Sequence, residues 1–203
     1  WTGEPKVYDA LPQYWEKVPA LEVDVPAAYW VMPEQHQVLA KLALHGIATT
    51  RIKSPKTIQL QQLTATQWTV APKSFESRFM IEAQFKRDWK KITLPAGAVR
   101  VSTDQPLGRL AVALLEPSAP DSLFHWGYMP GMFERTEYFE PYAIVPLIEE
   151  AAKQDKALKK EFDEAVKADK ELAASPEAKV QWWYKRLPYY DQKYLKYPIL
   201  LEH

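Results

Sequence analysis

Hydrophobic residues recur with a period of two between about residues 47 and 104. In the clearest run, 78–85, the apolar residues Phe79, Ile81, Ala83 and Phe85 occupy every second position. This spacing places their side chains on one face of a strand. Shorter β-rich runs occur in the same region, at 58–60, 68–70, 92–94 and 99–101. We therefore expect about five neighbouring strands in an antiparallel sheet or a small sandwich.

Apolar spacings of three and four residues indicate helices on both sides of this region. The segment 33–46 has one apolar face and ends at Gly46, a residue typical of a helix end. The leucines of 106–116 recur at helical spacing between two prolines. From 141 to 187 the pattern indicates two or three amphipathic helices, the last of them beginning at Ser175. The expected fold class is α+β, with a C-terminal helical region following the sheet.

Proline placement suggests the domain boundaries. Residues 1–26 carry prolines at 5, 12, 19 and 26, which predicts an extended linker arm. Residues 27–199 then form a single α+β domain, with a sheet part at about 47–104 and a helical part at about 106–187. Residues 201–203 look like the start of a purification tag, and the chain begins without Met. We therefore expect a fragment excised from a longer protein.

Charge and composition exclude several classes of partner. Lys plus Arg and Asp plus Glu both number 26, so no basic field is present to attract nucleic acid. No apolar run approaches the ~20 residues that a membrane span needs. The absence of cysteine removes disulfides, thiolate nucleophiles and cysteine-bound zinc together. We expect neither a nucleic-acid partner nor a membrane span.

Histidines and serines do not form a recognisable catalytic or metal motif. His36, His45 and His125 have no second His or Glu at the spacing that brings two ligands to one helical face. There is no Gly-x-Ser-x-Gly elbow, and six glycines leave no phosphate-binding loop of the glycine-rich kind. We therefore expect no catalytic residue, no metal ligand and no cofactor in this chain.

One stretch, 114–142, keeps two interpretations open. Asp121 and His125 are four residues apart, and Glu134 and Glu137 follow after a glycine, so these side chains could converge on an acid–base or metal site within 116–137. The alternative is structural: the prolines shape loops, Asp121 and Ser122 form turns, and the aromatic residues pack those turns onto the sheet. We favour the structural interpretation, because acids in polar loops are common.

Aromatic residues suggest a binding surface of another kind. Trp182 and Trp183 are adjacent in a predicted helix, so they cannot share one face, and one of them is expected to meet a second layer or a partner. Exposed rings can stack on sugars or form a protein-interaction patch. The candidate interaction surface comprises Asp121, Ser122, His125, Trp126, Glu134, Glu137, Tyr138, Trp182 and Trp183.

A series of short motifs resembles a known family. The series runs in order from about 20 to 199, and each member is weak alone. Its members are PAAYWVMP at 26–33, LHGI at 44–47, LPAGAVRV at 94–101, DQPL at 104–107, LLEPSAPDS at 114–122, Trp126-Gly127, Glu137-Tyr138 and Pro198-Ile199. Together they resemble the region downstream of the catalytic domain in large bacterial zinc carboxypeptidases of the carboxypeptidase A superfamily.

The resemblance implies a secreted or periplasmic parent enzyme whose His-x-x-Glu pair, later His and catalytic Glu lie upstream. No position in this chain matches those residues, so none of their roles is carried over, and zinc is expected only in the upstream domain. The chain would then be a noncatalytic accessory domain that docks on the peptidase domain of the same protein and shapes substrate access. The alternative is a carbohydrate or cell-wall binding module that uses aromatic residues around Trp126 or Trp182. A peptide or glycan ligand remains open in either case.

Overall fold

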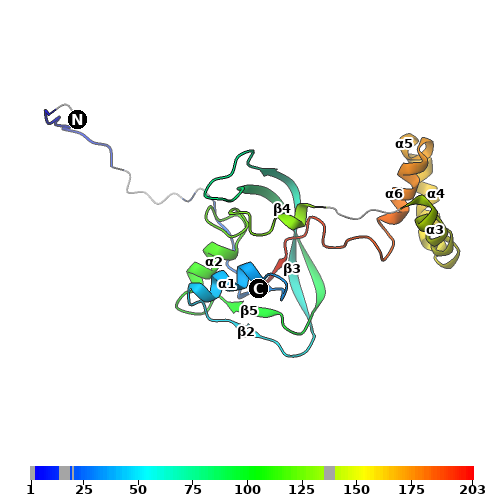
Figure 1. The fold of residues 1–203 in the computed structure, drawn as a ribbon, viewed down its shortest axis with the longest axis horizontal. Coiled ribbons are helices and arrows are strands. Elements are labelled where there is room, and N and C mark those ends of the chain that lie inside the picture. The colour runs from blue at the N-terminus through cyan, green and yellow to red at the C-terminus, as the bar shows by residue number, and fades with distance from the viewer. Residues whose placement is uncertain (1–2, 14–18, 20, 135–139) are drawn as a thin grey trace.

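The computed structural model describes residues 3–13, 19, 21–134 and 140–203. Its centre is an antiparallel sheet in the order β2-β5-β1-β6-β3-β4 (Figure 1). The strands are β1 (Ala28–Val31), β2 (Thr50–Arg51), β3 (Lys56–Val70), β4 (Ile81–Leu94), β5 (Val99–Ser102) and β6 (Ile199–Glu202). The helices are α1 (His36–Leu44), α2 (Gly108–Leu115), the 3-10 helix η1 (Pro130–Phe133), α3 (Pro141–Gln154), α4 (Lys156–Ala168), α5 (Lys170–Ala174) and α6 (Pro176–Tyr184). The predicted α+β class is confirmed.

Two long strands replace four of the expected short ones. The runs 58–60 and 68–70 both belong to β3, and 78–85 and 92–94 are largely contained in β4. Polar residues such as Gln62 interrupt the apolar pattern without ending the strand, because the Gln62 amide donates to the carbonyl oxygen of Tyr197 at 2.8 Å. Phe79 precedes β4 and is half exposed rather than buried.

The last strand includes two of the residues that were expected to belong to a tag. Leu201 is fully buried in β6, and Glu202 bonds to Trp30 of β1 and to Arg100 of β5. β6 pairs with both β1 and β3, so it lies in the interior of the sheet. Residues 201 and 202 are therefore part of the fold. The hydrophobic pattern of the sequence did not indicate this strand, because a run of four residues does not show that it pairs with strands far away in the sequence.

Both faces of the sheet are apolar. One face, which includes Tyr29 and Val31, packs against α1, α2 and the loop 117–133 and forms the main core. The other face forms a second cluster of buried side chains, made of Trp30, Leu60, Leu94, Ala98 and Leu200. Alternation along the strands sends neighbouring residues to opposite clusters, as strand geometry requires.

A bulge bends the long β3–β4 hairpin. The register shifts between Ala65 and Gln67, so Thr66 has no residue opposite it on β4. A bulge of this kind kinks a strand and increases its twist. The hairpin accordingly curves around the other strands, as Figure 1 shows. This curvature makes the second sheet face concave and positions the groove described below.

The four helices α3 to α6 form a separate helical unit. Their own apolar cluster is centred on Ile144, Tyr184 and Leu187, and Figure 1 shows the unit standing apart from the sheet. Two or three helices were expected here. Asp155 and Ser175 cap α4 and α6 with their side chains, and these caps divide the continuous helical pattern into shorter pieces.

Two further features complete the fold. Residues 3–13 of the expected arm are all exposed and extend away from the sheet (Figure 1). Helix α1 begins at His36 rather than near Pro33, and it ends before Gly46, whose φ of 72° is the left-handed conformation that glycine adopts most easily. Within the described ranges, none of the helices has the length and apolar character needed to cross a membrane.

A buried polar group lies between the sheet and α2. Glu116 is 1% exposed, and one of its oxygens accepts hydrogen bonds from Arg87 at 3.0 Å and from Ser118 at 2.8 Å. Among the described residues, the other carboxylate oxygen has no partner, and the Tyr29 hydroxyl is likewise buried without one. Burial, and next the charge of Glu116, raise the pKa of Tyr29 and of Tyr197. Both tyrosines are therefore neutral over the whole physiological range.

Loss of the hydroxyl group should change the free energy of unfolding differently for the two buried tyrosines. Tyr197→Phe removes a 2.8 Å bond to the carbonyl oxygen of Leu115, so it should lower the free energy of unfolding by about 1–2 kcal/mol. Tyr29→Phe removes a hydroxyl for which the described residues offer no partner, and it should be neutral within about 0.5 kcal/mol, or stabilising. Urea unfolding of both variants is the measurement. Equal losses would mean that the Tyr29 hydroxyl is in fact bonded.

Glu202 predicts a pH dependence of stability. Hydrogen bonds from Arg100 hold the pKa of Glu202 below its ordinary value of 4.5, against the opposing effect of burial, and a bond from Trp30 lowers it further. Because the folded-state pKa is depressed, this stabilisation is present above pH 4.5 and is lost as the pH falls through the lower folded-state value. Glu202→Gln should therefore lower the free energy of unfolding by about 1 kcal/mol at pH 7 and should not change it in strong acid. The figure is small because the carboxylate is partly exposed to solvent.

The matched control is Glu82→Gln, which removes an exposed carboxylate from β4. Urea midpoints are measured from pH 7 down to pH 3. Near pH 7 the midpoint of Glu202→Gln should lie below that of Glu82→Gln, and the difference should disappear as the pH falls. Identical curves for both would contradict a stabilising role for the Glu202 contacts.

Candidate functional site

Ser122 and His125 of the loop 117–133 have structural contacts. Ser122 is fully buried, and its Oγ accepts from the His125 backbone N–H at 3.1 Å. The ring Nδ1 of His125 lies 3.1 Å from the Ile81 carbonyl oxygen, and the Ile81 N–H donates to the His125 carbonyl at 2.9 Å. These bonds attach the loop to the start of β4, as the structural interpretation of this stretch expects.

Asp121 and Glu134 are exposed, whereas Trp126 is partly buried. The Trp126 indole N–H donates to Asp121 at 3.4 Å, and Glu134 is exposed just after η1. Glu137 and Tyr138 fall outside the described residues. Within those residues, no three His, Asp or Glu side chains come close enough together to hold a metal ion. The donor set that zinc requires is thus not assembled in the described part of this chain.

The paired tryptophans lie in the helical unit. Trp183 is 4% exposed, with its ring centroid 5.3 Å from that of Phe162. Trp182 is partly buried, packs against the same phenylalanine at 5.1 Å and carries the Arg186 guanidinium 3.6 Å above its ring. These rings hold α4 and α6 together. Whether Trp182 also contacts a partner remains a prediction.

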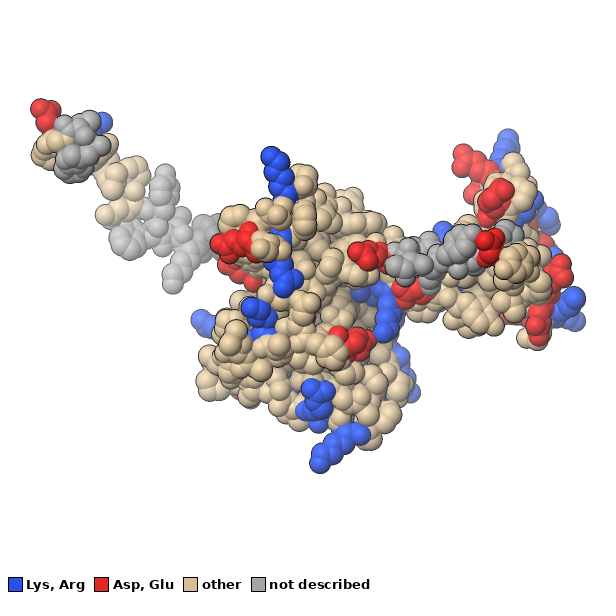
Figure 2. All heavy atoms as spheres, viewed as in Figure 1, with Lys and Arg blue, Asp and Glu red and all other residues tan. Residues whose placement is uncertain are grey.

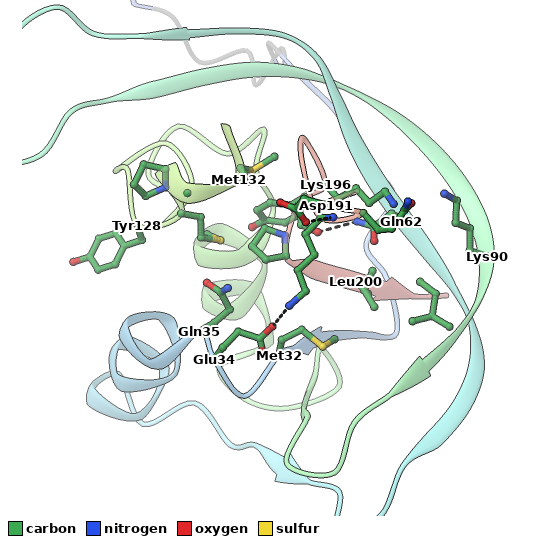
Figure 3. Close-up of a pocket in the computed structure, with 18 residues that line it drawn as sticks. Met32, Glu34, Gln35, Gln62, Lys90, Tyr128, Met132, Asp191, Lys196 and Leu200 are labelled. Atoms are coloured by element: carbon green, nitrogen blue, oxygen red, sulfur yellow. Dashed lines mark hydrogen bonds and ion pairs between the residues drawn. The ribbon is translucent and has the colours of Figure 1, made fainter. Parts of the chain in front are cut away.

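A groove of about 590 Å³ opens beside the concave sheet face (Figure 3). Its apolar floor includes Met32, Ile92 and Leu200, which belong to or adjoin the second cluster. One wall is the segment 128–132, and the other is the segment 191–198 that leads into β6. The volume falls within the range of small-molecule and peptide sites. No local pattern indicated it, because its residues come from five separate parts of the chain.

Lysines line one part of this groove. Lys90 projects from β4, and Lys196 lies in the segment before β6, where it forms an isolated β-bridge with Thr64. Burial, and next the charge of Lys90, lower the pKa of Lys196, while Asp191 acts in the opposite direction. Lys193 instead reaches Glu34 across the groove at 2.9 Å, a contact visible in Figure 3.

A second exposed feature is the hairpin-end patch, defined as Trp68, Val70, Phe75 and Phe79. Their exposed fractions are 39%, 50%, 58% and 51%. Trp68 and Val70 lie opposite Ala83 and Ile81 in the register, so they share the face that forms the main core. The apolar face of the hairpin therefore extends beyond the loop that covers it.

The loop 117–133 borders this patch. Phe133 stacks on Trp68 with centroids 5.3 Å apart, and Trp126 meets Phe75 at 6.0 Å. Gly127 has a φ of 66°, and a Cβ there would lie 2.4 Å from the Phe79 carbonyl oxygen, so only glycine permits this approach.

Figure 2 shows that the sheet unit is mostly uncharged on the face drawn, whereas acidic and basic side chains mix along the helical unit.

Comparisons with known proteins give one consistent relationship. The chain is 27% identical over 105 residues, 52% of its length, to proteins named Carboxypeptidase 2 from Trichophyton tonsurans and from Trichophyton equinum. It is 26% identical over 112 residues, 55% of its length, to Carboxypeptidase 2 from Trichophyton rubrum. It matches no family model, and no solved structure matches it.

The matches cover only part of each relative. They span 20%, 20% and 21% of the three relatives, so the chain corresponds to about a fifth of their length. The name of these relatives supports the resemblance to carboxypeptidases that the sequence motifs indicated. The relatives are fungal, so they do not support the bacterial and zinc-dependent part of that resemblance. About half of this chain is thus similar to a region of these carboxypeptidases.

Proposed function

We propose that this chain is a noncatalytic accessory domain of a carboxypeptidase, which docks on the peptidase portion of the protein and shapes substrate access. The observation that carries the proposal is the partial match: a carboxypeptidase-related region that corresponds to only a fifth of its relatives. The lack of a metal-ligand cluster among the described residues is compatible with it. In this proposal the zinc ion belongs to the peptidase portion, and the whole enzyme is secreted or periplasmic.

The hairpin-end patch is the docking surface in this proposal. Large apolar side chains that are half exposed and adjacent usually mark a surface that meets another protein. The patch extends the main core, so a partner that covers it adds to an apolar layer already packed below. Aromatic anchors of this kind commonly supply much of the binding energy at interfaces. Access to the peptidase site would then be limited by the curved hairpin itself.

Docking can be tested with the purified chain and the peptidase portion of its parent protein. Phe75→Ser and Phe79→Ser should each weaken the complex by about tenfold or more, because each removes an apolar anchor. Titration calorimetry measures this directly. The control is Leu44→Ser on α1. It likewise replaces a large exposed apolar side chain, 76% exposed, but outside the patch, so it should leave the affinity unchanged. Equal affinities for all variants, or no complex at all, would reject this docking surface.

A glycan-binding module is the second candidate, favoured by the same exposed rings. Trp68 lies in the patch and Trp89 is 51% exposed on β4, so bound sugars should shift tryptophan emission. The docking proposal expects no shift when peptidoglycan fragments are added to the isolated chain. A saturable shift that Trp68→Ala removes would favour the glycan-binding function instead.

A further inference from the structure

The groove combines an apolar floor with an excess of positive charge. Three lysines line it against two acids, and Lys193 is already paired with Glu34 at 2.9 Å. Lys90 and Lys196 form no ion pair within the described residues. Asp191 offsets them only in part, because its carboxylate also accepts the Lys193 backbone N–H at 2.8 Å. A ligand that brings a negative charge to this part of the groove would be attracted by both lysines.

Strand register explains why these lysines face the groove. Lys90 lies opposite Leu60, a member of the second cluster, so both point to the concave face. Lys196 lies opposite Thr64 and alternates with Tyr197, whose side chain enters the main core. Lys196, Pro198 and Leu200 therefore follow one another along the groove, from its wall to its floor, as Figure 3 illustrates for the labelled residues.

Gln62 brings a hydrogen-bond acceptor to the groove. Its side chain is 8% exposed, lines the groove and uses its amide nitrogen to donate to the carbonyl oxygens of Leu63 and Tyr197. The amide oxygen has no partner in the part of the chain that the structure describes. Solvent reaches this oxygen, so it is available to accept a hydrogen bond from a ligand N–H group that enters the groove.

We propose that the groove binds the C-terminal end of an extended peptide. The peptide's terminal carboxylate lies between Lys90 and Lys196, its apolar side chains pack on Met32, Ile92 and Leu200, and one of its N–H groups donates to Gln62. A fatty acid would supply the charge and the apolar chain but has no N–H group to donate to the Gln62 oxygen. The inference rests on the groove alone, and it holds or fails independently of docking through the hairpin-end patch.

The ligand chemistry is tested with three probes on the intact chain. They are acetyl-Gly-Leu-Phe with a free carboxylate, the same peptide as its C-terminal amide, and decanoate. Calorimetry should show binding of the acid, and binding of the amide that is weaker by about tenfold. The acid should also shift the side-chain amide resonance of Gln62 in NMR spectra. Equal binding of acid and amide, tighter binding of decanoate, or no binding of any probe at millimolar concentration would each overturn the proposal.

Charge substitutions locate the carboxylate. Lys196→Gln should weaken binding of the acid by about tenfold and leave the amide unaffected, so that the two probes become equivalent. Lys90→Gln, at an exposed position that a fold tolerates easily, should act in the same direction. The matched control is Lys91→Gln on the opposite face of β4, which should change nothing. Equal effects of Lys90→Gln and Lys91→Gln would show that only net charge matters and would reject the site.

Discussion

The pairing of β6 between β1 and β3 is the constraint on which the sheet depends. β3 and β4 bond extensively to each other, whereas the described strands β2, β5 and β1 form the other half of the sheet. β6 joins the two halves, and it comes from the last residues of the chain. Glu202 strengthens this junction, since its carboxylate holds Arg100 through two bonds of 2.9 Å. The two halves of the sheet can therefore join only once residues 199–202 are in place.

The segment that leads into β6 also builds the groove. Leu195 adopts a φ of 61°, a conformation that costs about 1 kcal/mol or more for a non-glycine residue. Two bonds of 2.8 Å hold it there: its N–H donates to Met132, and its carbonyl accepts from Ala65. This kink ties the loop 128–132 to β3. As a result, both walls of the groove are fixed by the contacts that close the sheet.

Sequence reasoning found what local patterns can reveal. The α+β class, helix α2 and the cap at Ser175 follow from spacing and from side-chain chemistry close in the chain. β6 and the lysines of the groove were missed, because Lys90 and Lys196 become neighbours only through the long hairpin and the final strand. The loop around Ser122 was recognised as a candidate, but its contacts with Ile81 depend on a register that a single sequence does not specify.

The central structural claim is that the sheet unit closes on itself and that the helical unit is an insertion between η1 and β6. The bond between Leu195 and Met132 places the two connection points of that insertion close together. The most direct measurement is urea unfolding of a variant in which residues 140–190 are replaced by a Gly-Ser linker. We expect one cooperative transition and retained near-ultraviolet circular dichroism, because β6 and the main core remain intact. Loss of cooperative unfolding would contradict it, since the sheet would then need the helical unit to fold.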